Sequence, residues 1–237
     1  MKNLNKLFVI SILLIFNISA FAKNGFEFIL NVPLQMGIGM PPKILKDNDV
    51  RASGEIAFDG GITAQLGYMT QISSRFGVSL LAELGYSHDT LGMSMSLNTT
   101  TVGSNFDERL SSYTSFDSLQ IGIIPKFNIG NFAIGIGGGI KIPMSGKIFV
   151  KALDIETSRR LNRGDIANII SPTILGYIKA SLDYSIFFMD NLAFNIGLIL
   201  GYDIFKDKSV DINGNKAYYG IFDMGVELGL KFGAKVD

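Results

Sequence analysis

Eight ionisable residues are the strongest candidates for chemistry in this sequence, because each lies in a segment where polar and apolar residues alternate. They fall into two groups by their expected height in the fold: Glu83, Lys141, Lys179 and Glu227 in one, and Glu27, Lys126, Asp183 and Lys231 in the other. A charge removed from water must be paired and hydrogen-bonded, or its burial is costly. The carboxylates and ammonium groups therefore predict two stacked ion-pair networks.

Paired charges of this kind favour a structural plug, although the same residues could line a gated path for protons or ions. Asp223 shares their parity, which makes five carboxylates and four ammonium groups, so the charges nearly cancel. No cofactor is expected. The chain has one His and no Cys, which excludes thiolate metal sites and disulfides, and its carboxylates do not cluster as in a calcium loop.

Two further patterns could indicate a catalytic or phosphate site, and both are weak. The glycine-rich run 135–139 lacks the Lys-Ser/Thr ending and the following helix of a phosphate loop. His88, the single histidine, follows Ser87 in a predicted strand. Neighbouring residues of a strand point to opposite faces, so these two side chains cannot readily act as base and nucleophile, and no enzyme is predicted.

The elements that must position these residues are β-strands, because apolar residues recur with period two rather than with a helical period. In the last segment, for example, Phe222, Met224 and Val226 alternate with Asp223, Gly225 and Glu227. The eight predicted strands span approximately residues 26–36, 61–68, 76–87, 118–127, 132–142, 177–186, 192–203 and 222–232.

The connections between these strands alternate in length. Tight turns are expected near 73–75, 128–131 and 188–191, and long loops near 38–55, 88–112, 143–171 and 205–216. Short and long connections therefore fall on opposite rims. An even strand count with this asymmetry predicts an all-β fold, an eight-stranded antiparallel up-and-down transmembrane β-barrel with short periplasmic turns and long extracellular loops.

The apolar parity is expected to face lipid. Eight strands enclose a bore only wide enough to be filled by side chains, and the other parity is rich in glycine and polar residues. A water-soluble barrel would have the opposite sidedness. Two aromatic girdles agree with the membrane assignment. Phe26, Phe76 and Phe127 are expected in the girdle at the short-turn end, and Tyr68, Tyr86 and Tyr202 in the other.

The start of the chain predicts export. Two lysines precede an apolar run, Leu7 to Phe16, and small residues follow at Ala20 and Ala22. This run is too short to span a bilayer as a helix. Residues 1–22 are therefore predicted to be a signal peptide, and residues 23–237 the barrel domain. Without Lys2 and Lys6 the chain has no basic excess, so nucleic acid is not an expected partner.

Repeated strand sequences carry a resemblance to a known family. The runs Asn191-Leu-Ala-Phe-Asn-Ile-Gly-Leu-Ile-Leu-Gly-Tyr202 and Phe76-Gly-Val-Ser-Leu-Leu-Ala-Glu-Leu-Gly-Tyr86 resemble the small outer-membrane β-barrel proteins, the superfamily of porin-like and adhesin-like eight-stranded barrels. The resemblance covers residues 23–237. It implies the bacterial outer membrane as location, with outer-membrane lipids and the export and barrel-assembly machinery as partners. Such barrels often end on Phe, whereas here Phe232 is followed by further residues.

The predicted function is that of an outer-membrane barrel with a closed, charge-plugged lumen. Its loops would serve surface interaction, adhesion or envelope integrity. The segment 145–171 is rich in basic residues, part of it could be helical, and it could contact a host or surface ligand. The alternative is a narrow channel for small solutes or ions. A lipid-modifying barrel enzyme is less favoured, and would gain support if His88 faced lipid beside a carboxylate from a neighbouring strand.

Overall fold

The computed structural model of the chain describes residues 24–42, 51–101, 104–152, 155–170, 172–212, 215–233 and 235. The signal peptide predicted for residues 1–22 lies outside these described residues. The described elements are β1 (Asn24–Met40), β2 (Arg51–Ser73), β3 (Phe76–Thr101), β4 (Ser104–Ile129), β5 (Phe132–Ala152), β6 (Ile155–Asn162), α3 (Arg163–Ile169), β7 (Leu175–Met189), β8 (Leu192–Ile212) and β9 (Asn215–Gly233).

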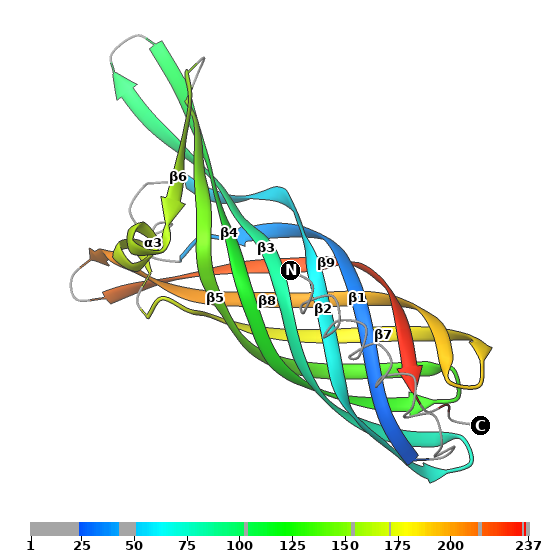
Figure 1. Cartoon of the computed structure of the whole chain (residues 1–237). Helices are drawn as coiled ribbons and strands as arrows, with labels where there is room; N and C mark the ends of the chain where they lie inside the picture. Colours follow the sequence, from blue (N-terminus) through cyan, green and yellow to red (C-terminus); the bar gives the residue numbers. More distant parts are fainter. Residues whose placement is uncertain are drawn as a thin grey trace, which may run out of the picture.

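Eight of these strands close into a ring. Each pairs antiparallel with its neighbour in the order β1-β2-β3-β4-β5-β7-β8-β9, and β9 pairs with β1 to close it. β6 lies outside the ring, paired with β5. Closure satisfies the backbone groups of every ring strand, which a lipid environment requires. The predicted eight-stranded antiparallel barrel is therefore confirmed (Figure 1).

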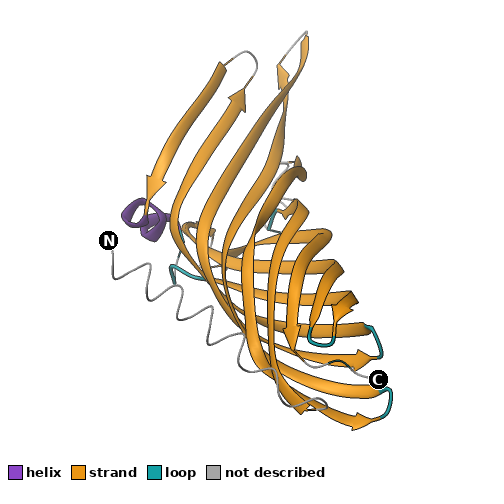
Figure 2. Cartoon of the chain, turned by 45° about the vertical axis from the view of Figure 1, so that its right-hand side comes forward, coloured by secondary structure: helices purple, strands orange, loops and turns teal. Residues whose placement is uncertain are grey.

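Tight turns gather at one rim, as Figure 2 shows. Two residues separate β2 from β3, β4 from β5 and β7 from β8. Gly130 in the second of these turns has a positive φ of 57° and donates its N–H to the carbonyl of Arg75, 3.2 Å away, in the adjacent turn. Glycine adopts this backbone conformation without the steric cost that other residues incur.

At the opposite rim the long connections are largely β-structure. The β3–β4 ladder continues past His88 and Asp117 to Thr101 and Ser104, and β5 and β6 form a second hairpin. We call residues 89–101, 104–116, 146–152 and 155–170 the extension; in Figure 1 its strands continue well beyond the ring. The sequence indicated solvated loops here. Continued pairing satisfies backbone groups that a loop would leave to water.

The helical part expected within residues 145–171 is present as α3. Asn162 caps it by accepting a hydrogen bond from the backbone N–H of Asp165, whose carboxylate accepts one from the N–H of Asn162 in return. This reciprocal capping box stabilises so short a helix. α3 has only seven residues, and the described part of the chain holds no helix with the length and apolarity that a membrane span requires.

A hydrophobic cluster lies where the extension begins. The ring strands, β6, α3 and the residue after it contribute the members of this cap cluster, which are Leu91, Phe116, Leu161, Ile166, Ile170, Leu175, Phe205, Ala217, Tyr219 and Ile221. The Phe205 ring packs edge-on to that of Phe116 and stacks on that of Tyr219, with centroids 5.6 and 5.8 Å apart. Burial here raises the pKa of the Tyr219 phenol to about 12, so this side chain stays neutral.

Candidate functional site: the polar interior and the outer face of the barrel

The two faces of the ring strands differ sharply in polarity. Leu198 is 59% exposed on the outside, whereas Glu227 is fully buried inside. We call the outward set the apolar belt; it includes Leu66, Leu80, Leu84, Ile121, Ile123, Ile134, Ile136, Ile178, Leu182, Ile196, Leu198 and Leu228. These large side chains would be unfavourably exposed in water, so the surface that they cover requires an apolar solvent.

Aromatic residues flank the belt, with one correction to the expected girdles. Tyr68 was predicted at the rim opposite the short turns, and this is wrong: it pairs with Phe26 near the short turns, with ring centroids 6.1 Å apart. β2 runs toward a short turn, so a residue near its end belongs to the girdle there. Phe76 and Phe127 also meet at that rim, 6.4 Å apart.

The charged residues inside form three layers. In the lower layer, nearest the short turns, Lys126 of β4 donates to Asp183 of β7 at 2.7 Å, and both side chains are only 2% exposed. Lys231 of β9 forms an ion pair with Glu27 of β1. The structure thus places these four residues in two buried pairs across the lower bore.

The middle layer is built around Glu83. Its carboxylate accepts hydrogen bonds from Lys179 at 2.7 Å, Gln65 at 2.8 Å, Tyr177 at 2.9 Å and Gln120. Glu227 accepts one from Asn31 at 2.9 Å and lies 3.9 Å from the ammonium group of Lys179. Six ring strands contribute to this layer, so it ties opposite walls of the barrel together.

Lys141 does not join this layer, contrary to the expected grouping. Its ammonium group contacts Asp203 at 2.6 Å and Asp89 at 2.8 Å, in an upper layer. The cause is the register of the strands. Glu83 pairs with Gly122 of β4, whereas Lys141 pairs with Gln120, which lies two residues closer to the extension. Counting residues from the short turns did not include this offset.

The upper layer contains three acidic residues that the sequence analysis omitted. Asp89 and Asp203 bind Lys141, and Asp59 is fully buried. Asp59 lies between the predicted loop 38–55 and the predicted strand 61–68, and Asp89 lies in the predicted loop 88–112, although continuing the period of two from Gly61 and Ser87 reaches them. Asp203 already had the inward parity. The alternation was therefore a sufficient signal for all three.

These additions change the charge balance of the bore. The three layers contain eight carboxyl groups, those of Glu27, Asp59, Glu83, Asp89, Asp183, Asp203, Asp223 and Glu227. They contain four ammonium groups, those of Lys126, Lys141, Lys179 and Lys231. The near cancellation expected from the sequence is wrong. The acidic excess lies mainly in the upper layer, where Asp89, Asp203 and Asp223 surround Lys141 and Asp59 lies beside Asp89 and Asp223.

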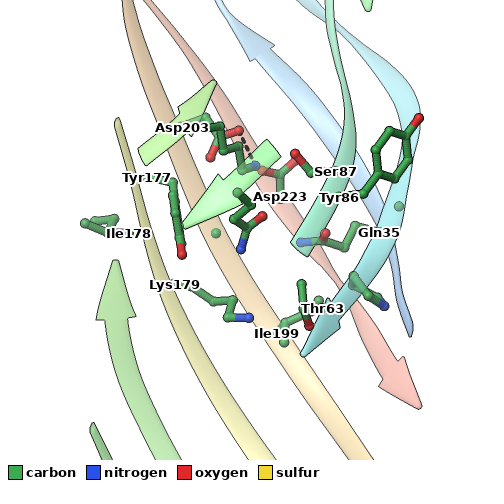
Figure 3. A pocket seen from close by; sticks show the side chains of 15 residues that line it. Gln35, Thr63, Tyr86, Ser87, Tyr177, Ile178, Lys179, Ile199, Asp203 and Asp223 are labelled. Atoms are coloured by element: carbon green, nitrogen blue, oxygen red, sulfur yellow. Dashed lines mark hydrogen bonds and ion pairs between the residues drawn. The ribbon is translucent and has the colours of Figure 1, made fainter. Parts of the chain in front are cut away.

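A small cavity lies between the middle and upper layers. Its volume is about 30 Å³, and Gln120, Lys141, Lys179, Asp203 and Asp223 are among its lining residues. A water molecule needs roughly 10–15 Å³ measured in this way, so the cavity has room for about two. Figure 3 shows Lys179 and Asp223 pointing into this space, whereas Ile178 and Tyr86 point away from it.

His88 lies on the outer face, not in the bore. Its Nδ1 is 2.7 Å from a carboxylate oxygen of Asp117 on β4, which also accepts a hydrogen bond from Tyr86 at 2.7 Å. Ser145 donates to the other oxygen at 3.0 Å. Ser87 points inward and donates to Asp89.

His88 therefore faces outward beside a carboxylate from a neighbouring strand, the arrangement that would favour a lipid-modifying enzyme. The hydroxyl groups nearby, those of Tyr86 and Ser145, donate to Asp117. Within the described residues none is hydrogen-bonded to the free nitrogen of His88, where a nucleophile would be needed. No group of three His, Asp or Glu side chains in the described ranges could hold a metal ion.

The closed ring, the outward apolar belt and the inward charges together decide the class of protein. The molecule is an eight-stranded transmembrane β-barrel of the outer-membrane type. Only closed barrels and helices can satisfy all their backbone polar groups within lipid. Lipid-facing apolar residues that alternate with polar interior residues are typical of transmembrane β-barrels.

Comparisons with known proteins add fold likeness only. No protein-family model matches the chain, and no curated protein does. Among solved structures, the barrel is similar to the attachment invasion locus protein Ail of Yersinia pestis, with 12% identity, a TM-score of 0.38, and coverage of 87% of this chain and 98% of that one. It is also similar to the outer-membrane protease OmpT of Escherichia coli, with 8% identity, a TM-score of 0.41, and coverage of 88% and 96%. Identities this low transfer neither activity nor ligand.

Proposed function

We propose that this barrel is a closed, non-catalytic outer-membrane protein that presents its extension for surface interaction, adhesion or envelope integrity. The observation that carries the proposal is the filling of the bore. Three charged layers cross it, and the cap cluster lies above them. A barrel whose interior is occupied in this way has the extension as its remaining accessible surface.

The middle layer supports the plug in particular. Glu83 is held by four donors, and its partner Lys179 also lies beside Glu227. Breaking a buried pair leaves an uncompensated charge, so opening a path through this layer would be costly. Hydrogen bonds from several strands at once also hold the barrel cross-section fixed.

Single-channel recording in planar bilayers tests the proposal. Folded protein, verified by its heat-modifiable migration in gels, should give no stable unitary openings. As a positive control, replacing both Glu83 and Lys179 by Ala removes the centre of the middle layer and should permit brief openings. Stable openings of the unaltered protein would contradict the closed lumen.

A narrow cation path is the second candidate function, because of the acidic excess in the upper layer. Three carboxyl groups, those of Asp89, Asp203 and Asp223, surround the ammonium group of Lys141, and Asp59 lies beside them. Asp203 and Asp223 also line the small cavity. Rings of carboxylates favour cations in pores. If the unaltered protein conducts, a reversal potential measured across a KCl gradient should show cation selectivity, and Asp223→Asn should weaken it. Anion selectivity would exclude the cation path.

A further inference from the structure

A band of polar residues lies on the outer face directly beyond the apolar belt, where the ring passes into the extension. In the ladder that joins β3, β4 and β5, the pairs Tyr86–Leu119 and Leu119–Ile142 form the last apolar row. The next row is polar and the row after it is partly basic. We call these two rows the polar band; its members are His88, Asp117, Ser145, Ser115, Lys147 and Arg160.

The position of the band matches the headgroup region of a bilayer. Each row is two residues beyond the previous one, and a strand rises about 3.3 Å per residue. The row of Lys147 and Arg160 therefore lies about 13 Å along the tilted strands beyond the last apolar row. Tyr86, in that last row, is 47% exposed on the outside, where interfacial aromatic residues belong.

The acidic member of the band is already satisfied. Asp117 accepts hydrogen bonds from Tyr86 and Ser145 and contacts His88 at 2.7 Å. It is therefore a poor partner for the two cations in the next row.

Lys147 and Arg160 are neighbours across the β5–β6 ladder and are both exposed. Neither side chain has a hydrogen-bond or ion-pair partner among the residues that the structure describes. The next basic residue on the same face, Lys151, differs because it pairs with Glu156 at 3.1 Å. The band thus contains two adjacent uncompensated cations, on backbones that lie one strand spacing, about 4.8 Å, apart.

We propose that Lys147 and Arg160 bind the phosphate of an anionic lipid headgroup in the outer leaflet. A guanidinium group binds two phosphate oxygens with its planar fork, and an ammonium group adds a point charge beside it. The lipid is the occupant because the band is continuous with the apolar belt, so a lipid whose acyl chains lie on Leu119 and Ile142 presents its headgroup at this row. The site lies outside the bore, so it does not depend on whether the lumen is closed.

Spin-labelled lipids test the site on the full barrel in nanodiscs. The motionally restricted fraction of labelled phosphatidylglycerol should exceed that of labelled phosphatidylcholine. Replacing Lys147 and Arg160 by Gln should lower this preference by about fivefold for each charge removed, because a basic residue near an anionic surface contributes on that order. Lys151→Gln is the matched control, since it removes a cation of the same hairpin that already has a partner, and it should leave the preference unchanged.

Three results would overturn the proposal. They are equal restriction of the two lipids by the unaltered barrel, an unchanged preference in the double variant, and an equal loss in the Lys151→Gln control. Inorganic phosphate in excess over lipid separates the two sources of the same chemistry. It should displace little of the labelled phosphatidylglycerol, because it lacks acyl chains, and complete displacement would show a phosphate site that does not select lipid. Heat-modifiable migration of each variant verifies that it is folded.

Discussion

The belt region and the extension use the same strands with opposite polarity. In the belt region of β4, Gln120 points inward while Leu119 and Ile121 face out. Four residues farther toward the extension, Phe116 is buried inside while Asp117 and Ser115 face out. The same alternate residues point inward along the whole strand, but they are polar in the belt region and apolar in the extension. The surroundings explain the reversal, because the outer face meets acyl chains in the first region and polar headgroups and water in the second.

The upper acidic layer lies at this reversal. Below it the interior is polar and tied by ion pairs, and above it the interior is the apolar cap cluster. The extension is thus organised like a water-soluble protein built on a membrane barrel. This contrast predicts that charges stabilise one interior and apolar packing the other.

The largest effect is expected when one partner of a lower pair is removed. Lys126→Met leaves Asp183 buried without its ammonium partner, which should lower the free energy of unfolding by about 3–5 kcal/mol. Urea unfolding in lipid vesicles measures it. The double variant Lys126→Met with Asp183→Leu removes both charges and should recover most of the loss. A double variant no more stable than the single one would show that packing, rather than charge pairing, organises the lower interior.

The cap cluster should respond to lost volume instead. Phe116 is 1% exposed and contacts the Phe205 ring, so Phe116→Ala should cost about 3–5 kcal/mol, as for other buried aromatic residues. Hydrogen exchange should locate the loss in the extension and α3, with the ring strands of the belt still protected. Loss of protection throughout the barrel would mean that the two regions unfold as one unit.

The same reversal explains how far the sequence could predict this molecule. Alternation gave all eight ring strands and their sidedness, because lipid on one side and a narrow bore on the other impose a single polarity pattern. The alternation predicts strands only as far as Ser118 and Ser87, because the polarity of the two faces changes there, and the paired strands beyond them resemble loops in the sequence. A periodicity analysis that allows the polar face to switch would continue through Asp89 and Phe116.

For the interior residues, the sequence predicts which side chains face the bore but not which of them pair. Parity alone placed Lys126, Asp183 and Glu83 in the bore. It could not pair them, because which residues meet depends on the stagger between strands, and that stagger moved Lys141 away from Glu83 to Asp89 and Asp203. The cap cluster was not predictable from alternation, since it combines residues of α3 and β6 with ring strands far away in the sequence.

Placing a charge on the outer face of the belt region and on that of the extension compares the two regions directly. The expected effect is smaller than those of the two interior substitutions. Leu198→Arg puts a guanidinium group on the apolar belt and should cost about 2–4 kcal/mol if the residue lies near the bilayer midplane. Ile155 on β6 is the matched control: it is 70% exposed, lies in the extension, and Ile155→Arg should change stability little because water solvates the new charge. Urea titrations in the same vesicles provide both values. Equal costs would place both residues in one solvent, and the reversal of polarity would then need a cause other than the edge of the membrane.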